Sequence, residues 1–454
     1  MHIIFNSSLL LLALAINGNL AADPQTVATN ITVATDEFLI NPGTHTKLPC
    51  LMLACSEDES VLRLAKDLKY DLEFTDQVGI DLKKTDKEPT EQVVKKLFTQ
   101  GTSLAITIKP TELATAKQRG KLHITVRDTH SNQTLFDDTC PYGKTTTYFD
   151  SHEMAGKILP AITGEPSPFG GSLAYCKQYS SFHKVICMSD VAGRKEQVIV
   201  PNLTLSVAPR WHTQAPVLFY SQFTKSNTRL MSVNVHNCKQ RTICSADGLN
   251  MQPSFSDDGK QVALCMSGKR GNTEVYLYDQ EVSKTKNKRI YKQITHNHGN
   301  NTSPCLLPNG DIVFCSDFQT GSPQIYYLDT KKHVTRRLSS GKGYCAAPSY
   351  HTESRNVVYT RLIDGGFQLF SLNIDDARHR EIQLSFGSGD KIDPAWSPCG
   401  RFVAFTYDTK DAKSNKRIPQ IGILNCASKS IRIVTHSRQP KSFPTWINKP
   451  FYAT

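Results

Sequence analysis

Two histidines in one short segment are the first candidates for metal chemistry. His296 and His298 lie in the stretch THNHGNN, which begins at Thr295. A zinc site needs three or four protein ligands, and this stretch contains neither a carboxylate nor a third histidine. We therefore expect two exposed loop histidines, and we predict neither a metal site nor a cofactor.

Thirteen cysteines form a larger set of side chains with possible chemistry. None shows the CxxC spacing of a zinc site, since four residues separate Cys50 from Cys55. In an exported chain disulfides are expected, and the odd count leaves at least one thiol unpaired or intermolecular. Cys238 and Cys244 flank one predicted hairpin turn, so they form the most plausible disulfide. The rest of the pairing is open.

The elements that carry these residues repeat along the chain. Six segments share a proline followed two places later by an aromatic or large apolar residue. Their prolines are Pro209, Pro253, Pro304, Pro348, Pro394 and Pro444. The intervals between these prolines, 44, 51, 44, 46 and 50 residues, match the length of a four-stranded blade. Three copies continue into a glycine turn, such as Asp257–Gly259, that joins the first two strands of a hairpin.

Two further motifs recur six times in step with the prolines. One is an apolar strand that ends in a small residue, namely Cys176, Ser221, Cys265, Cys315, Thr360 and Thr406. The other is a strand that ends in Asp or Asn, namely Asp190, Asn234, Asp279, Asp329, Asn373 and Asn425. Six copies in three registers predict a six-bladed β-propeller. The three cysteines at the small-residue position are then structural, and they are too far apart to pair with one another.

The order of the motifs also predicts how the ring closes. The first small-residue strand begins at Leu173, before any proline copy, whereas the last proline copy lies near the C-terminus. We therefore expect the C-terminal strand to pair with the N-terminal blade, which leaves no open sheet edge.

The same strands argue against an enzyme. A glycosidase would place paired carboxylates in the central tunnel, yet the innermost strands read PRWH, PSFS, PCLL, PSYH, PAWS and PTWI, without an acid. A peptidase would need a following domain with a GxSxG motif, and eight residues follow Trp446. We predict that the protein is not an enzyme. The alternative is an exported propeller enzyme, such as a glycosidase or a hydrolase accessory domain.

Before the repeats, helices and strands alternate. A capping box from Ser56 to Glu59 predicts a helix with Val61, Leu64 and Leu68 on one face. A second predicted helix follows Thr90, with Val94, Leu97 and Phe98 on its apolar stripe, and a third begins near Asp150. Residues 103–109, 121–128 and 132–138 have strand patterns.

The chain is predicted to divide into three parts. Residues 1–22 have the form of a secretory signal, because the apolar stretch 9–16 is followed by small residues and is too short to span a bilayer. Residues 23–165 form a small α/β domain, and residues 170–454 form the propeller. A Pro/Gly cluster marks the boundary, across which we expect few contacts and therefore independent folding.

The net charge of +12 by itself favours an anionic neighbourhood. The basic runs at 284–292 and 410–417 fall where turns are expected and lack an array of aromatic residues. We expect solvated turns and no nucleic acid partner.

The repeat P-x-[WF]-S-x-[DC]-G, then V-A-[FL], then a strand ending in Asp, resembles the WD40-like repeat of the TolB family. The α/β domain and the junction from 162–165 to 172–175 resemble that family in order and spacing. The resemblance implies a mixed fold, with a small N-terminal α/β domain followed by a six-bladed all-β propeller. It further implies a monomeric, non-enzymatic periplasmic component of the Tol-Pal cell-envelope system that supports envelope integrity and cell division, peripheral at most to the membrane.

The resemblance also implies partners and a binding face. A Pal-like peptidoglycan-associated lipoprotein would dock on the loops of one propeller face, and a TolA-like inner-membrane protein would bind the mature N-terminus. Asn300-Asn301-Thr302 matches the N-N-T-x-P motif of a Pal-contacting loop. Two other loops of this face supply the remaining candidates, which are Asn250, Met251, Asp390 and Lys391. The loop with Asn250 departs from the charged or His-containing form of the family, and Asn300-Asn301-Thr302 could instead be a turn that hydrogen-bonds its own backbone.

Overall fold

The computed structural model of the chain describes residues 47–115, 118–143, 148–268, 271–286, 288–341, 343–410 and 417–449. The predicted signal peptide, the start of the mature chain and most of the basic run 410–417 lie outside the described residues.

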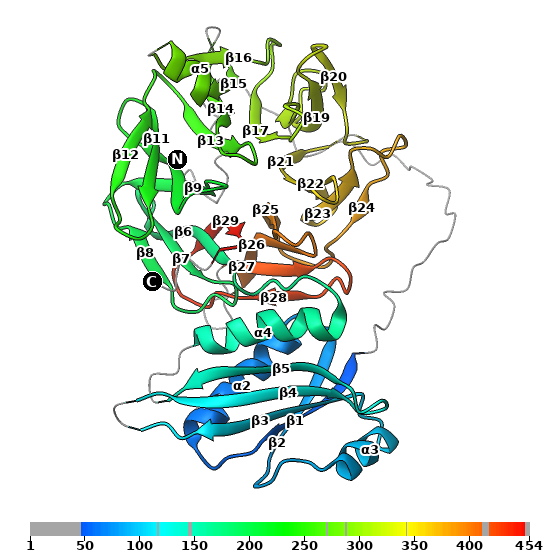
Figure 1. Cartoon of the computed structure of the whole chain (residues 1–454). Coiled ribbons are helices and arrows are strands. Elements are labelled where there is room, and N and C mark those ends of the chain that lie inside the picture. The colour runs from blue at the N-terminus through cyan, green and yellow to red at the C-terminus, as the bar shows by residue number, and fades with distance from the viewer. Residues whose placement is uncertain are drawn as a thin grey trace.

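The first unit is a five-stranded sheet with the order β2-β1-β3-β4-β5 (Figure 1). Its strands are β1 (Leu48–Ala54), β2 (Val78–Lys84), β3 (Leu104–Glu112), β4 (Gly120–Asp128) and β5 (Thr134–Tyr142). β1 runs parallel to β2 and β3, and the other pairs are antiparallel. The sequence pattern predicts β3, β4 and β5 but not β1 or β2. β1 is buried over five successive residues, so it lacks the alternation that marks a strand with one exposed face.

Three helices complete this unit. α2 (Glu59–Glu73) and α4 (Tyr148–Thr163) share one apolar core with the sheet, and Leu97 of α3 (Glu91–Thr99) packs with Leu51, Leu53 and Ala105 in a separate cluster. Two sequence details are corrected. Asp58, not Ser56, caps α2, because its carboxylate accepts a hydrogen bond from the backbone N–H of Ser60. Phe98 is 47% exposed, although Val94 and Leu97 of the same predicted stripe are buried.

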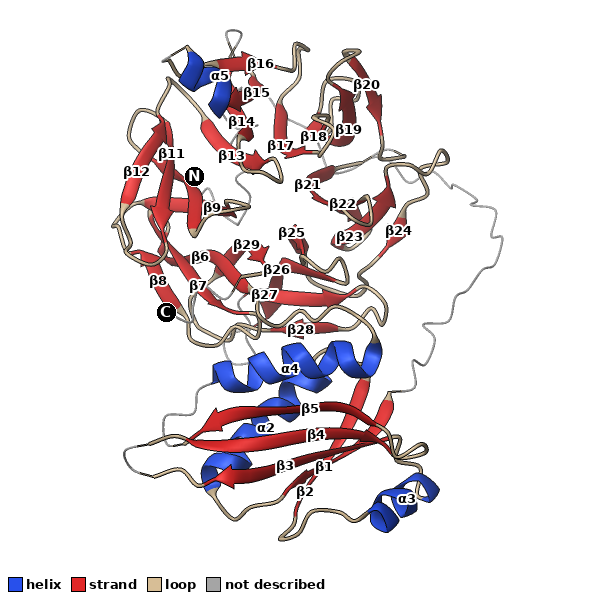
Figure 2. Cartoon of the chain, in the orientation of Figure 1, coloured by secondary structure: helices blue, strands red, loops and turns tan. Residues whose placement is uncertain are grey.

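The remaining strands surround a common axis as a β-propeller (Figure 2). Four sheets have four strands each in sequence order, β13–β16, β17–β20, β21–β24 and β25–β28. Their bounds are β13 (Asn250–Phe255), β14 (Gln261–Ser267), β15 (Thr273–Asp279), β16 (Tyr291–Gln293), β17 (Asn301–Leu306), β18 (Ile312–Ser316), β19 (Gln324–Asp329), β20 (Val334–Arg337), β21 (Cys345–His351), β22 (Asn356–Ile363), β23 (Gly366–Asn373), β24 (Ile382–Gln383), β25 (Lys391–Trp396), β26 (Phe402–Lys410), β27 (Arg417–Asn425) and β28 (Ile431–Ile433). The short helix α5 (Gln280–Thr285) lies between β15 and β16.

The other eight strands form a single sheet. They are β6 (Ser172–Ser180), β7 (His183–Asp190), β8 (Gln197–Val200), β9 (Leu205–Trp211), β10 (Val217–Phe223), β11 (Thr228–Asn234), β12 (Gln240–Cys244) and β29 (Lys441–Ile447). One pairing, Lys184 with Leu205, joins the strands of the first two predicted blades. The propeller fold is therefore confirmed, whereas six separate blades are not.

The ring closes through its last strand, as the order of the motifs predicts. β29 pairs antiparallel with β6, with Ser442 opposite Cys176 and Trp446 opposite Leu173. The C-terminal strand β29 is thus the innermost strand of the first predicted blade, next to β6.

The residue before each repeat proline adopts an unusual backbone conformation. The φ angles are 51° for Ala208, 53° for Gln252, 51° for Ser303, 52° for Ala347, 54° for Asp393 and 55° for Phe443. Each lies beside a shift of the pairing register between the first and second strands. A left-handed backbone conformation costs free energy at a non-glycine residue. Its recurrence at six equivalent positions shows that the bulge is a regular part of every innermost strand.

The small residues of the second strands explain part of this geometry. The hydroxyl of Thr406 accepts a hydrogen bond of 3.1 Å from the backbone N–H of Phe443 on the next innermost strand. The backbones of Ala208 and Ser303 interact in the same way with Cys176 and Cys265. These thiols are completely buried, and burial raises the pKa of each to about 12. The structural interpretation of these cysteines is confirmed.

No cysteine forms a disulfide in the structure, which describes all thirteen. The predicted Cys238–Cys244 bond is wrong. The thiol of Cys244 instead donates to Oδ1 of Asn250, 3.1 Å away, inside the adjoining loop.

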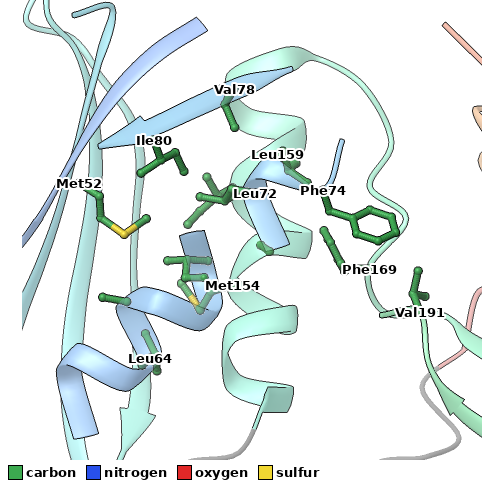
Figure 3. Close-up of a cluster of buried hydrophobic side chains, with 14 of the residues drawn as sticks. Met52, Leu64, Leu72, Phe74, Val78, Ile80, Met154, Leu159, Phe169 and Val191 are labelled. Atoms are coloured by element: carbon green, nitrogen blue, oxygen red, sulfur yellow. The ribbon is translucent and has the colours of Figure 1, made fainter. Parts of the chain in front are cut away.

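The α/β unit and the propeller share one apolar core. It extends from Met52 and Leu72, through Phe74 and Phe169, to Val191 at the end of β7 (Figure 3). Phe402, Ile421 and Val434 of the propeller belong to the same cluster. The expectation of few contacts across the boundary is therefore wrong, because the propeller edge completes the core of the α/β unit.

Polar contacts reinforce this interface. Nδ2 of Asn425 donates to the carbonyl oxygen of Thr75 at 2.8 Å, and Arg432 lies 3.2 Å from the Asp76 carboxylate. None of the described helices combines the length and the apolar content that a membrane-spanning helix requires.

Candidate partner-binding face

The direction of the innermost strands defines two faces of the propeller. β9, β13, β17, β21, β25 and β29 are these strands. Each enters from the loop before its proline, and five of them leave through the hairpin turn to the second strand. All six preceding loops therefore emerge on one face, here called the loop face. The hairpin turns emerge on the other, here called the turn face.

Asn300, Asn301 and Thr302 lie at the loop face, but their side chains do not all reach its surface. Asn301 is completely buried, and its amide donates to Glu274 Oε2 at 2.8 Å and to the carbonyl oxygen of Gly299 at 3.2 Å. Thr302 is 8% exposed. Asn300 is half-buried, and its backbone N–H and side-chain amide donate to the two oxygens of Asp317. The structure thus supports a loop-shaping role for Asn301, and the partner contact stays a prediction.

Asn250 and Met251 occupy the equivalent place in the neighbouring loop. Asn250 is completely buried, and its amide donates to the carbonyl oxygens of Thr228 at 2.8 Å and of Ala246 at 2.6 Å. Met251 is 4% exposed. These contacts tie the start of β13 to the loop before it and to β11 of the preceding sheet.

Lys391 is also buried, which is unusual for a lysine. Its ammonium donates to the carbonyl oxygens of Phe386, Gly387 and Ser388, at 3.1, 3.0 and 2.9 Å. Burial lowers the pKa of Lys391, and the neighbouring charge of Asp390 opposes that shift. Asp390 accepts a hydrogen bond of 2.9 Å from the backbone N–H of Phe367, so it too serves the local structure.

These buried candidates share one position in the repeat. Asn250, Asn301 and Lys391 each stand three residues before a repeat proline, as do three further residues that are also buried, Ser206, Cys345 and Lys441. A polar residue here can bind the carbonyl groups of the loop that precedes its strand. The sequence does carry this signal, but only when the six copies are compared at that position.

Sequence reasoning missed exposed apolar side chains on the same face. Here we call them the apolar rim: Tyr179, Phe182, Leu203, Leu362 and Phe386, which are 50, 79, 84, 44 and 59% exposed. Tyr179 and Phe182 flank the β6–β7 turn, Leu203 precedes β9, Leu362 lies near the end of β22 and Phe386 precedes β25. All of these segments reach the loop face. The available signal was a large apolar residue in a turn or at the strand end beside it.

The tunnel differs from the sequence expectation in one respect. An acid does occur on an innermost strand, because Asp393 belongs to β25. Burial raises the pKa of Asp393 to about 7, while Arg210 and the hydroxyl of Thr406 act in the opposite direction. One such acid does not supply the carboxylate pair that glycoside hydrolysis needs.

His296 and His298 are both exposed, and no group of three or more metal-binding side chains occurs among the described residues.

Comparison with known proteins places this geometry in context. The family model described as "TolB beta propeller domain" matches residues 160–447. The Tol-Pal system protein TolB of Francisella tularensis subsp. mediasiatica is 27% identical over 311 residues, which are 64% of this chain and 69% of that protein. The protein of the same name from Helicobacter pylori is 25% identical over 249 residues, 52% of this chain and 58% of that protein.

A solved structure is similar over both units. The crystal structure of TolB from Acinetobacter baumannii superimposes with a TM-score of 0.73 at 19% identity, and it covers 88% of this chain and 96% of that one. At this identity the match supports the fold.

Proposed function

The chain belongs to the TolB β-propeller family, and from this premise we propose that it is a non-enzymatic, periplasmic protein-binding component of a Tol-Pal cell-envelope system. In this proposal a Pal-like lipoprotein docks on the loop face, and a TolA-like partner binds the mature N-terminus, which lies outside the described residues. The family match, which covers most of the chain, is the observation that carries the proposal.

The loop face has the properties of a docking surface. Partner interfaces commonly combine exposed apolar or aromatic anchors with polar groups around them. The apolar rim supplies Phe182 and Leu203, which are among the most exposed large apolar side chains described. Burying them against a partner would remove apolar surface from water.

The clamped loops supply preorganisation. The side chains of Asn250, Asn301 and Lys391 donate to carbonyl oxygens of the loops before their strands, so these loops need little further ordering when a partner binds. We therefore assign direct contact to the apolar rim and to half-buried groups such as Asn300. The buried residues act by holding the shape of the face.

Affinity capture tests this proposal. The mature protein, immobilised, should retain a Pal-like peptidoglycan-associated lipoprotein from an envelope extract. The variants Phe182→Asp and Leu203→Asp should each weaken that capture at least tenfold, because a charge would have to be desolvated in the interface.

Val334→Asp is the matched control. Val334 is also apolar and exposed, 56%, but it begins β20 on the side of the turn face. This variant should capture the lipoprotein as well as the unchanged protein does. Failure to retain such a lipoprotein, or equal loss in the control, would contradict the proposal.

A further inference from the structure

The half of the tunnel nearer the turn face contains a cavity of about 400 Å³. Its walls come from the ends of the innermost strands and include Trp211, Phe255, Tyr350, Trp396 and Trp446. A volume of this order is within the range of small-ligand sites. All three tryptophans of the chain line this one cavity.

Arg210 lines the same cavity, where its side chain is half-buried. Its guanidinium donates one hydrogen bond of 2.9 Å, to the carbonyl oxygen of its neighbour Pro209. Among the described residues it forms no ion pair, and Asp393 is the one carboxylate that acts on its charge. Burial raises the pKa of Asp393 to about 7, which favours the neutral form of this carboxyl more than in an exposed aspartate.

An arginine has five N–H donors, and a desolvated cation without an anionic partner is costly. The tunnel therefore holds a positive group with unused donors beside aromatic walls. Tyr350 adds a buried hydroxyl that has no hydrogen-bond partner in the described part of the chain. Such a set of groups favours a ligand that carries an oxygen anion on an apolar body.

The outer part of the cavity has the opposite charge. Asp257 and Glu353 line it from the hairpin turns, and both are exposed. A simple anion would be repelled at this entrance, whereas a ligand with a cationic end would be attracted.

We propose that this cavity binds the carboxyl-terminal end of a short peptide. The terminal carboxylate pairs with Arg210, an apolar side chain packs against the tryptophan walls, and the free amino group faces Asp257 and Glu353. This site lies on the side of the turn face, so it is independent of the partner that docks on the loop face.

Tryptophan fluorescence of the whole mature protein tests the proposal directly, because every tryptophan lines the cavity. The probe is the dipeptide alanyl-leucine, compared with its C-terminal amide, its N-acetyl form and sodium acetate. We expect a saturable change with alanyl-leucine and an affinity about 10- to 100-fold lower for the amide, the scale of a charge-assisted hydrogen bond.

Two sets of variants identify the groups. Arg210→Gln should lose binding, whereas Arg229→Gln, at an exposed arginine of β11, should keep it. The double change Asp257→Asn and Glu353→Gln should weaken binding of alanyl-leucine but not of its N-acetyl form.

Several outcomes would overturn the proposal. They are the absence of a saturable change, equal affinity for the amide, and full binding by a folded Arg210→Gln protein. Acetate binding as tightly as the dipeptide would show an anion site and refute the peptide assignment. If Arg210→Gln does not fold, the affinities of the unchanged protein for alanyl-leucine and for its C-terminal amide still test the proposal.

Discussion

At the scale of single residues, a buried histidine joins the two units. His152 of α4 lies between two carboxylates, with Nδ1 2.8 Å from Asp71 Oδ2 and Nε2 2.8 Å from Asp190 Oδ2. Asp71 belongs to α2 and Asp190 ends β7, so the histidine connects the α/β unit to the propeller. The Phe169 ring stacks on the imidazole, with centroids 5.3 Å apart.

The charge of His152 should matter for stability. Burial alone lowers its pKa, but the interactions with Asp190 and Asp71 outweigh burial and raise the pKa from 6.5 to about 9. Replacing it by Gln leaves two buried carboxylates without a cation between them. We expect His152→Gln to lower the free energy of unfolding by about 3–5 kcal/mol, measured by urea denaturation at pH 7.

The pH dependence has a definite sign. A pKa that is raised in the folded state gives a stabilisation that is complete below pH 6.5 and is lost as the pH rises through 9. The unchanged protein should therefore lose stability between pH 7 and 10, and His152→Gln should lose less. Lys157→Gln, an exposed change on the same helix, should follow the unchanged protein.

Asn301 gives a second test at this scale. From the sequence alone, changing Asn301 and Thr302 to Ala is expected to weaken partner capture and to leave folding intact. Burial changes that expectation, because Asn301→Ala would leave the buried Glu274 carboxylate short of a donor. We now expect a loss of about 1–3 kcal/mol in the free energy of unfolding, read from the shift of the urea midpoint.

Asn300→Ala is its matched control, since this neighbouring side chain is half-buried and bonds to Asp317. It should cost less stability than Asn301→Ala. An unchanged urea midpoint in Asn301→Ala would refute the stabilising role of the Asn301 side chain.

At the scale of elements, the propeller ring depends on its closing strand, β29. β29 pairs with β6 and also packs against the neighbouring innermost strands β25 and β9, and its buried residues include Phe443 and Trp446. Without it, β6 would expose an edge of unpaired backbone groups.

Deleting residues 443–454 should therefore abolish cooperative unfolding of the propeller or cause aggregation, followed by light scattering and circular dichroism. Deleting only residues 450–454, which lie beyond β29, should leave the melting temperature within a few degrees. A truncated protein that melts like the full chain would exclude the closure that the strand pairing implies.

At the scale of the whole molecule, the shared core makes the two units interdependent. Phe169, Phe74 and Phe402 meet where the units join, with ring centroids 5.6 and 6.1 Å from Phe74. An interface built on such a core is unlike the polar and loosely packed contact that usually separates mobile domains.

Proteolysis between residues 166 and 171 tests this interdependence. In place of two independent folded pieces, we expect the cut chain to stay associated in size-exclusion chromatography. We also expect the isolated α/β piece to bind a hydrophobic dye, because its core would be exposed. Clean separation into two pieces, each with cooperative unfolding, would show that the shared core is dispensable.

Elements that depend on local pattern are predictable from the amino-acid sequence alone. Strands that pair within one blade are close together in the chain, so the blade repeat is visible in the sequence at six prolines. The position of the first and last copies predicts that β29 pairs with β6. Small residues such as Cys176 were recognisable as structural because the same position recurs in each copy. β1 was not predicted, because a strand buried on both faces lacks the alternation of apolar and polar residues.

The burial of individual polar residues is not predictable from local sequence and follows from the packed fold. Asn301 lies in a sequence context typical of an exposed contact, but its side chain is enclosed by Glu274 and the loop backbone. The interface between the α/β unit and the propeller was also not predictable, since Asn425 hydrogen-bonds to Thr75, which is 350 residues away in the sequence. The physical reason is that burial depends on neighbours distant in sequence, whereas turn and strand patterns depend on neighbours that are close.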